Sequence, residues 1–82
     1  MQAINYIAGI SGGMEKFDLE GREYVALCDL MKLAGLCHSG GMAKTLISNG
    51  NVTVDGEVEL RKRCKIRPGQ IVEFDGQSVV VE

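Results

Sequence analysis

The sequence predicts an α+β domain in which two short helices pack on one face of a small antiparallel sheet. Two apolar patterns of helical period lie in the first half of the chain, and alternating apolar residues lie in the second half. Asp-Gly pairs divide the alternating part into hairpins. The chain has 82 residues, which is enough for one hydrophobic core, so we expect a single domain.

Residues 1–13 differ in composition from the rest of the chain. They carry no charged side chain and end in Ser11-Gly12-Gly13, which is typical of a flexible joint. We expect a flexible N-terminal extension or an added remnant over residues 1–13, and the folded domain over residues 14–82. The segment lacks the features of a signal peptide, and no apolar run reaches the roughly 18 residues of a membrane span. We therefore expect a cytoplasmic protein that does not enter the membrane.

The first helical pattern lies in the segment 23–34. Its apolar residues follow the spacing i, i+3, i+4, i+7 and share one helix face: Leu27, Leu30, Met31 and Ala34. Gly35 stands where helices commonly end. The dipeptide Tyr24-Val25 before the pattern fits either a short strand or the entry to the helix.

The second helical pattern lies between Ser39 and Gly50. Ser39 is a favourable N-cap, and Gly50 is a favourable residue after a helix C-terminus. The apolar face of this helix consists of Met42, Ala43, Leu46 and Ile47. Few residues separate the two patterns, so we expect a tight helix pair.

Beyond Gly50 the apolar period changes to two, and Asp55-Gly56 marks the first hairpin. A two-residue loop pairs Val54 with Glu57 and places the apolar residues of the two strands on opposite faces. A three-residue loop with a glycine bulge aligns them instead, and we prefer it. The expected pairs are then Val54 with Val58 and Val52 with Leu60.

Pro68-Gly69 marks a further turn and leads to a second hairpin around Asp75-Gly76. Here a two-residue loop aligns the apolar residues and pairs Val72 with Val79. Phe74 alternates with Val72, so we expect it in the core. An exposed aromatic platform for stacking bases is accordingly disfavoured.

Positive charge is concentrated in one short stretch, although the formal net charge of the chain is −2. Five of the nine Lys and Arg residues lie between positions 61 and 67. We call this stretch the basic segment; its cations are Arg61, Lys62, Arg63, Lys65 and Arg67. Such a dense group of cations suits phosphates, while the alternative is an ordinary solvated loop.

The start of the second helix is a second candidate site for phosphate. Ser39-Gly40-Gly41 would present unpaired backbone N–H groups to an anion, with Lys44 one turn later and His38 just before. The alternative is an ordinary helix cap, since the full phosphate-loop pattern is missing.

Metal binding and catalysis find little support. Cys28, Cys37 and Cys64 lack the paired spacing of zinc ligands, so we expect buried or half-buried thiols and no metal or other cofactor. Their odd number also excludes a closed disulfide framework. No nucleophile and base are paired, and we expect no enzyme.

Residues 27–69 resemble the RNA-binding domain named after small-subunit ribosomal protein S4, also called the alpha-L motif, in its small stand-alone bacterial form. The matching residues are Leu27, Leu30, Leu33, Gly35, Ser39, Ala43, Leu46, Ile47, Gly50, Val52, Val54, Gly56, Pro68 and Gly69. The resemblance implies binding of structured RNA, of the ribosomal or transfer RNA class, through the helix pair and the adjoining strand loop.

The chain departs from that family at two positions that bear on phosphate. Gly40 stands where many members have arginine, and Ala26-Leu27-Cys28 replaces a common Arg-Leu-Asp. We expect Lys44 and the basic segment to take over these contacts, with Lys32 as a further candidate.

The sequence thus predicts a monomeric, non-enzymatic RNA-binding protein. The expected contacts are Ser39, Gly40, Gly41, Lys44, the five cations of the basic segment, Lys32 and His38. The main alternative is an adaptor that binds ribosome-assembly proteins, which the acidic overall balance favours. A small enzyme or metal protein is the third interpretation.

Overall fold

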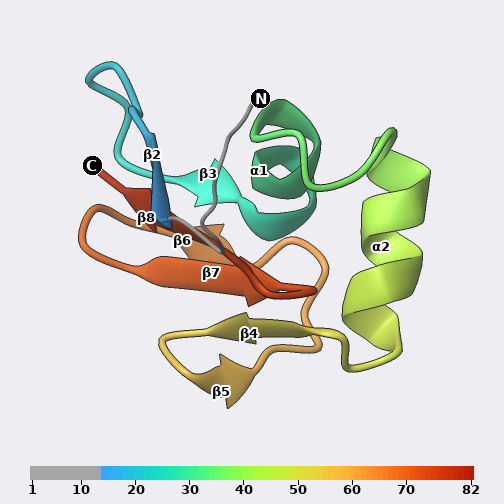
Figure 1. The fold of residues 1–82 in the computed structure, drawn as a ribbon. Helices are drawn as coiled ribbons and strands as arrows, with labels where there is room; N and C mark the ends of the chain where they lie inside the picture. The colour runs from blue at the N-terminus through green and yellow to red at the C-terminus, as the bar shows by residue number, and fades with distance from the viewer. Residues whose placement is uncertain (1–13) are drawn as a thin grey trace, which may run out of the picture.

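A mixed sheet of five strands forms one layer of the computed structural model, which describes residues 14–82. The strand order is β2 (Met14–Phe17), β8 (Gln77–Val81), β7 (Ile71–Phe74), β4 (Val52–Val54) and β5 (Glu57–Val58). A separate two-stranded ribbon pairs β3 (Val25–Ala26) with β6 (Lys65–Ile66). Helices α1 (Leu27–Leu33) and α2 (Gly40–Ser48) pack against the same face of the main sheet (Figure 1). The predicted α+β class is confirmed.

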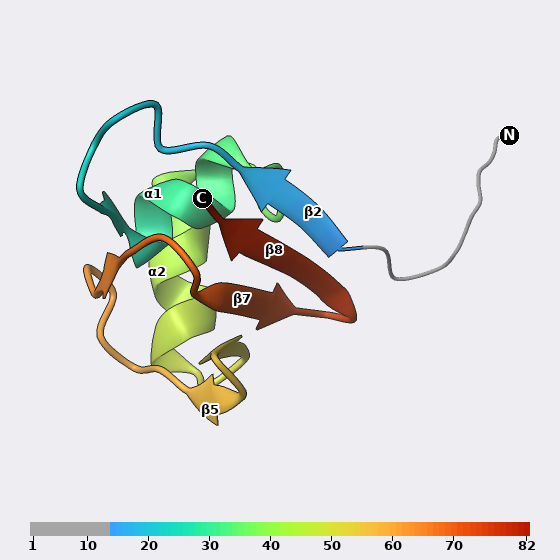
Figure 2. The same ribbon diagram turned by 90° about the vertical axis from the view of Figure 1, so that its left-hand side faces the viewer.

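One strand pair departs from the predicted antiparallel sheet. Strand β2 runs parallel to β8, with Met14 opposite Ser78 and Phe17 opposite Val81 (Figure 2). The prediction rested on hairpins, which join consecutive strands, whereas β2 and β8 lie at opposite ends of the described chain. The expected flexible extension, residues 1–13, lies outside the described residues, and the domain boundary stays a prediction.

Helix α1 begins directly after strand β3, so Tyr24-Val25 leads into a strand rather than into the helix. Leu27, Leu30 and Met31 are fully buried, as their spacing predicts. The chain leaves the helix at Gly35, whose φ of +80° suits a residue without a Cβ atom. Within residues 14–82 no side chain caps the start of α1; backbone carbonyls of the basic segment do so, as described below.

Helix α2 has the predicted cap. The hydroxyl of Ser39 accepts a hydrogen bond of 3.1 Å from the backbone N–H of Met42. Ala43 and Ile47 are fully buried, and Leu46 packs partly against the core. Met42 is the exception on the predicted apolar face, since 46% of it is exposed.

The core lies between the helix pair and the sheet. Helix α1 contributes Leu27, Leu30 and Met31, while β4, β7 and β8 contribute valines from the sheet face that they present to the helices. The sheet valines are Val52, Val54, Val72, Val79 and Val81, and the other buried residues are Leu19, Val25, Ala26, Cys28, Leu36, Ala43, Ile47 and Ile66. Phe74 packs against this core but is only partly buried.

The first hairpin has the register that we did not prefer. Val54 pairs with Glu57 and Thr53 with Val58, so Asp55-Gly56 is a two-residue turn in which both residues have positive φ. The predicted three-residue loop is wrong because β5 is an edge strand that buries no apolar face. Val58 and Leu60 are 58% and 59% exposed. The second hairpin is as predicted, with Val72 opposite Val79.

The side chain of Asp55 ties the first hairpin to β7. Its Oδ1 accepts a hydrogen bond of 2.9 Å from the backbone N–H of Ile71, and its Oδ2 accepts one of 3.3 Å from Gln70. Its own backbone N–H donates to the carbonyl oxygen of Ile71 at 2.8 Å. These hydrogen bonds across the sheet outweigh the apolar alignment of the two strands.

Replacing Asp55 by Ala should destabilise the domain more than replacing Asp75 by Ala. Both residues open an Asp-Gly turn with a φ of 52°, so both variants carry the same backbone strain. Of these two residues, only Asp55 has side-chain hydrogen bonds within residues 14–82. We expect D55A to lose about 1–2 kcal/mol more unfolding free energy than D75A. Urea denaturation measures this, and equal losses would contradict the role of the Asp55 carboxylate.

Candidate nucleic-acid interface

The basic segment is a turn followed by a short strand, and it is bonded to the start of helix α1. The backbone N–H of Leu27 donates to the carbonyl oxygen of Cys64 at 2.9 Å, and that of Cys28 donates to the carbonyl oxygen of Lys62 at 3.0 Å. The N–H groups of a first helical turn lack partners within the helix. The carbonyls therefore satisfy them, and the exposed side chains of Lys62 and Arg63 extend from a backbone held at two points.

An open hollow of about 630 Å³ lies between the basic segment and the hairpin of β4 and β5. Both signs of charge line it, since Asp55, Glu57 and Glu59 lie among Arg61, Lys65 and Arg67. The remaining lining residues are Val54, Val58, Cys64 and Gln70. The cations of this face are therefore not equally free to meet a phosphate.

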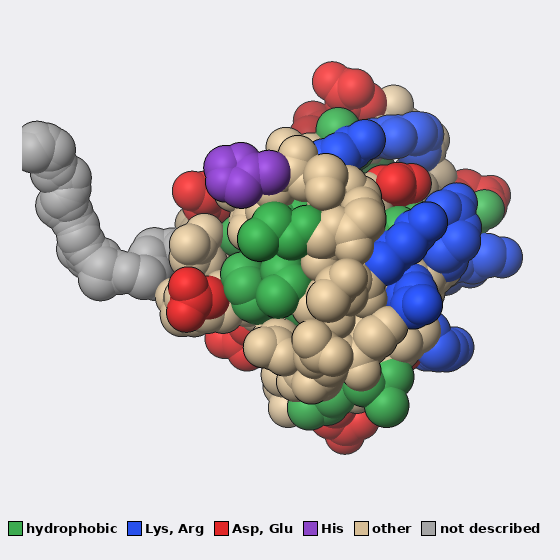
Figure 3. All heavy atoms as spheres, turned by 90° about the vertical axis from the view of Figure 1, so that its right-hand side faces the viewer, with side chains coloured by type: hydrophobic (Ala, Val, Ile, Leu, Met, Phe, Trp, Pro, Cys, Tyr) green, Lys and Arg blue, Asp and Glu red, His purple; other side chains and the backbone are tan. Residues whose placement is uncertain are grey.

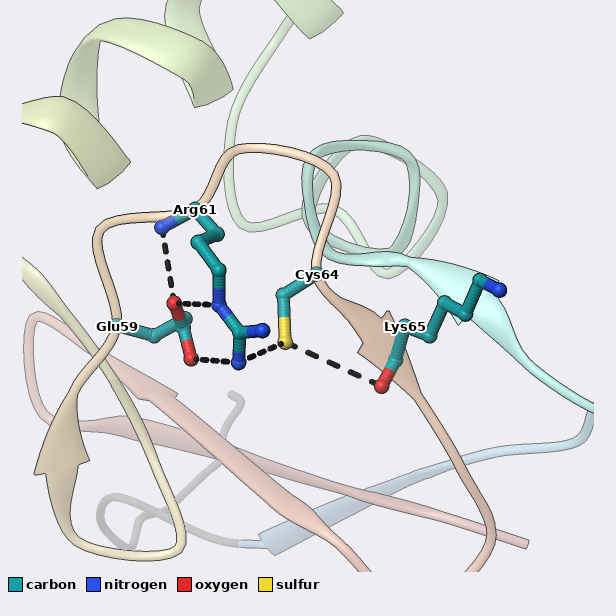
Figure 4. Close-up of polar contacts among 4 residues, drawn as sticks. All are labelled: Glu59, Arg61, Cys64 and Lys65. Atoms are coloured by element: carbon teal, nitrogen blue, oxygen red, sulfur yellow. Dashed lines mark hydrogen bonds and ion pairs between the residues drawn. The ribbon is translucent and has the colours of Figure 1, made fainter.

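Arg61 is engaged by Glu59 (Figure 4). Its Nε donates to Oε2 of Glu59 at 2.9 Å and its Nη2 to Oε1 at 3.0 Å, while its backbone N–H donates to Oε2 at 2.9 Å. These hydrogen bonds lower the pKa of Glu59 from 4.5 to about 2 and raise the pKa of Arg61. Residues i and i+2 of an extended chain share a face, a spacing that sequence inspection could have used to find this pair.

Cys64 lies beside this pair. Its Sγ is 3.4 Å from Nη2 of Arg61. Burial, followed by the charge of Glu59, raises the pKa of the Cys64 thiol, which is therefore protonated at neutral pH. Cys28 is buried and Cys37 is half-buried like Cys64, as predicted, and all three thiols are free.

Lys65 and Arg67 surround an aromatic ring that the sequence prediction did not include. Lys65 Nζ lies 5.0 Å and Arg67 Cζ 5.6 Å from the centroid of the Tyr24 ring. The Lys65 side chain points away from the pair of Glu59 and Arg61 (Figure 4). The pairing of β3 with β6 brings Tyr24 to these cations, and a two-residue ribbon leaves too short a pattern to be detected in sequence.

Lys62 and Arg63 are the least engaged cations of the basic segment. Both are exposed, and within residues 14–82 neither side chain makes a hydrogen bond or an ion pair. Arg63 also lines a second, smaller hollow of about 400 Å³ with Arg61, Cys64 and Lys65. Any added anion would thus meet these two side chains without displacing a carboxylate.

The start of helix α2 is a separate part of the surface. Gly40 is half-buried and Gly41 exposed, and a Cβ atom at Gly40 would meet no atom within 4 Å. The backbone is therefore open to a ligand, although the Ser39 hydroxyl already accepts from one N–H group. Lys44, His38 and Lys32 are all exposed.

The structure brings the cations of the basic segment together but does not bring His38 to them. The segment is bonded to the start of α1, whereas α2 begins after the end of α1. The whole of α1 and the six residues that follow it lie between the two places along the chain. Figure 3 shows Lys and Arg side chains on one side of the face that bears α2, and the His side chain on the other.

Residues 14–82 hold no cluster of three or more His, Cys, Asp or Glu side chains that could bind a metal ion. Neither α1 nor α2 is long and apolar enough to cross a membrane.

The ion pair between Glu59 and Arg61 predicts a specific acid response. Because the pKa of Glu59 is lowered on folding, the pair stabilises the domain fully above about pH 4.5. That contribution should disappear as the pH falls through about 2. Carboxyl-carbon NMR titration should return a pKa of about 2 for Glu59, and Arg61→Gln should move it toward 4.5. The matched control, Arg63→Gln, should leave it low; a low pKa in both variants would disprove the assignment.

Three comparisons with known proteins agree with this architecture. The S4 domain family matches residues 17–82. The chain is 54% identical over 68 residues to "Putative RNA-binding protein YbcJ" of Escherichia coli, covering 83% of this chain and 97% of that protein. It is 39% identical over 54 residues to "Probable ribosome maturation protein RlbA" of Bacillus subtilis, covering 66% and 76%.

A solved structure is similar as well. The solution structure of Escherichia coli YbcJ, described as revealing an alpha-L motif involved in RNA binding, superposes with a TM-score of 0.67 at 49% identity. The superposition covers 93% of this chain and 96% of that one. The expected resemblance is thereby confirmed: the chain belongs to the S4 domain family and has the alpha-L fold.

Proposed function

We propose that this protein binds structured RNA by contacting the phosphates of the RNA backbone, and that it carries out no catalysis. The observation that carries the proposal is the exposed pair Lys62 and Arg63, which extends from a backbone bonded to α1 and meets no carboxylate within residues 14–82. A fixed, unneutralised pair of cations suits a polyanion, because binding releases the counterions condensed on it. The names of YbcJ and its alpha-L motif support the same partner class.

The remaining cations contribute unequally in this proposal. Lys65 and Arg67 add charge beside the first pair, while Arg61 contributes less because Glu59 already engages it. A second contact forms at the start of α2, where Ser39, Gly40 and Gly41 offer backbone donors. Lys44, Lys32 and His38 line the periphery of this second contact.

Two separated contacts favour a folded RNA over a short single strand. One lies at the start of α1 and the other at the start of α2, so an RNA would have to present phosphates to both places. We propose ribosomal or transfer RNA as the class, bound by a monomer in the cytoplasm. The name of the Bacillus subtilis relative, which refers to ribosome maturation, favours ribosomal RNA over transfer RNA.

An adaptor that binds ribosome-assembly proteins is the second candidate. Val58 and Leu60 are 58% and 59% exposed on the edge of the sheet, which suits an apolar protein contact better than RNA. Such a complex would tolerate salt, whereas binding to phosphates would not.

The test compares two lysines that carry the same charge. Lys62→Ala removes a proposed phosphate contact, while Lys16→Ala removes an exposed lysine of β2, at the opposite edge of the sheet from β5. We expect K62A to weaken binding to ribosomal RNA and to lower the slope of log Kd against log salt by about one. K16A should match the wild type. Identical slopes for all three proteins would refute the proposed interface, and salt-independent binding to a protein partner would favour the adaptor.

A further inference from the structure

We infer that Tyr24 is a stacking contact for one unpaired nucleotide, whose phosphates are bound by Lys65 and Arg67. This inference rests on the proposed RNA-binding function and adds a preference for an unpaired base. It also reverses the expectation that no exposed aromatic side chain stacks on RNA bases. That expectation was argued from Phe74 and did not take Tyr24 into account.

The register of the β3–β6 ribbon places the three side chains together. Val25 lies opposite Ile66, and both are buried. Side chains alternate between the two faces of a strand, so the neighbours of this buried pair lie on the outer face. The neighbours are Tyr24, Ala26, Lys65 and Arg67; Ala26 is buried, and the other three are exposed.

Tyr24 is partly open to solvent. The residue is 40% exposed and belongs to no part of the hydrophobic core. Its described neighbours at the ring are the cations of Lys65 and Arg67, at 5.0 and 5.6 Å from the centroid. The negative face of an aromatic ring attracts cations, which offsets the repulsion between the two charges and holds them in place.

This combination of groups matches the chemistry of a nucleotide. A base offers a flat π-face that stacks on tyrosine, and its phosphates offer negative charge to the adjacent cations. Lys65 and Arg67 also line the 630 Å³ hollow, whereas Tyr24 does not. An acidic peptide would use the cations but would gain nothing from the ring.

The nucleotide must be unpaired. A base inside a helix is stacked on both faces by its neighbours, and only a bulged, looped or terminal base exposes a face to a protein side chain. The site therefore selects RNAs in which an unpaired nucleotide adjoins a helix whose phosphates reach Lys62 and Arg63.

The test uses a fully paired RNA hairpin and the same hairpin with one bulged 2-aminopurine, whose fluorescence is quenched by stacking. We expect wild type and Tyr24→Phe to prefer the bulged hairpin and to quench it. Tyr24→Leu should lose about tenfold in affinity for the bulged hairpin, lose the quenching, and keep its affinity for the paired one. The salt slope of Y24L should equal that of the wild type, whereas Arg67→Ala should lower it by about one.

Other outcomes are equally decisive. If Y24L weakens both hairpins equally and lowers the salt slope, Tyr24 is a positioning residue for the cations and the stacking inference is wrong. If Y24L binds and quenches like the wild type, the inference is also wrong, while the proposed function stands. If the wild type binds neither hairpin in a salt-dependent way, the proposed function itself fails. Circular dichroism of each variant establishes that loss of binding is not loss of fold.

Discussion

The hydrogen bonds between the first turn of helix α1 and the carbonyls of the basic segment hold the helix layer and the candidate interface together. Helix α1 has no side-chain cap from the described residues 14–82, and the carbonyl oxygens of Lys62 and Cys64 take that place. A helix start repels nearby cations through its dipole. The backbone of the segment supplies carbonyl oxygens to this helix end, while the exposed side chains of Lys62 and Arg63 extend into solvent. One set of bonds thus both completes a helix and orients a group of charges.

The charges of this face are organised by three different partners rather than by sequence proximity. Arg61 is held by the carboxylate of Glu59, and Lys65 and Arg67 are held by the ring of Tyr24. Lys62 and Arg63 have neither kind of partner within residues 14–82. The five cations of the basic segment therefore differ in their partners: one is paired with a carboxylate, two lie at an aromatic ring and two have neither. A count of Lys and Arg residues cannot distinguish these cases.

Local features were predictable from the sequence, and contacts between distant segments were not. The exit of the chain from α1 at Gly35 and the cap of α2 by Ser39 depend only on neighbouring residues, and both were predicted correctly. The register of the first hairpin depends on Asp55 bonding across the sheet to Ile71, which no local pattern reveals. Tyr24 reaches its cations only because two-residue strands pair across the chain. The clustering of positive charge was visible in sequence; its division among partners required the structure.

The parallel pairing of β2 with β8 has a consequence for the order in which the domain assembles. The chain between Met14 and Ser78 must be looped closed before these residues can meet. Closing so long a loop has a large entropic cost, so contacts between sequence neighbours form faster. We therefore expect that the helix pair and the two Asp-Gly hairpins assemble first and that β2 docks last on the edge of β8. Until it does, β8 is an open edge that another chain could pair with; after docking, β2 covers β8 and is itself the edge strand within residues 14–82.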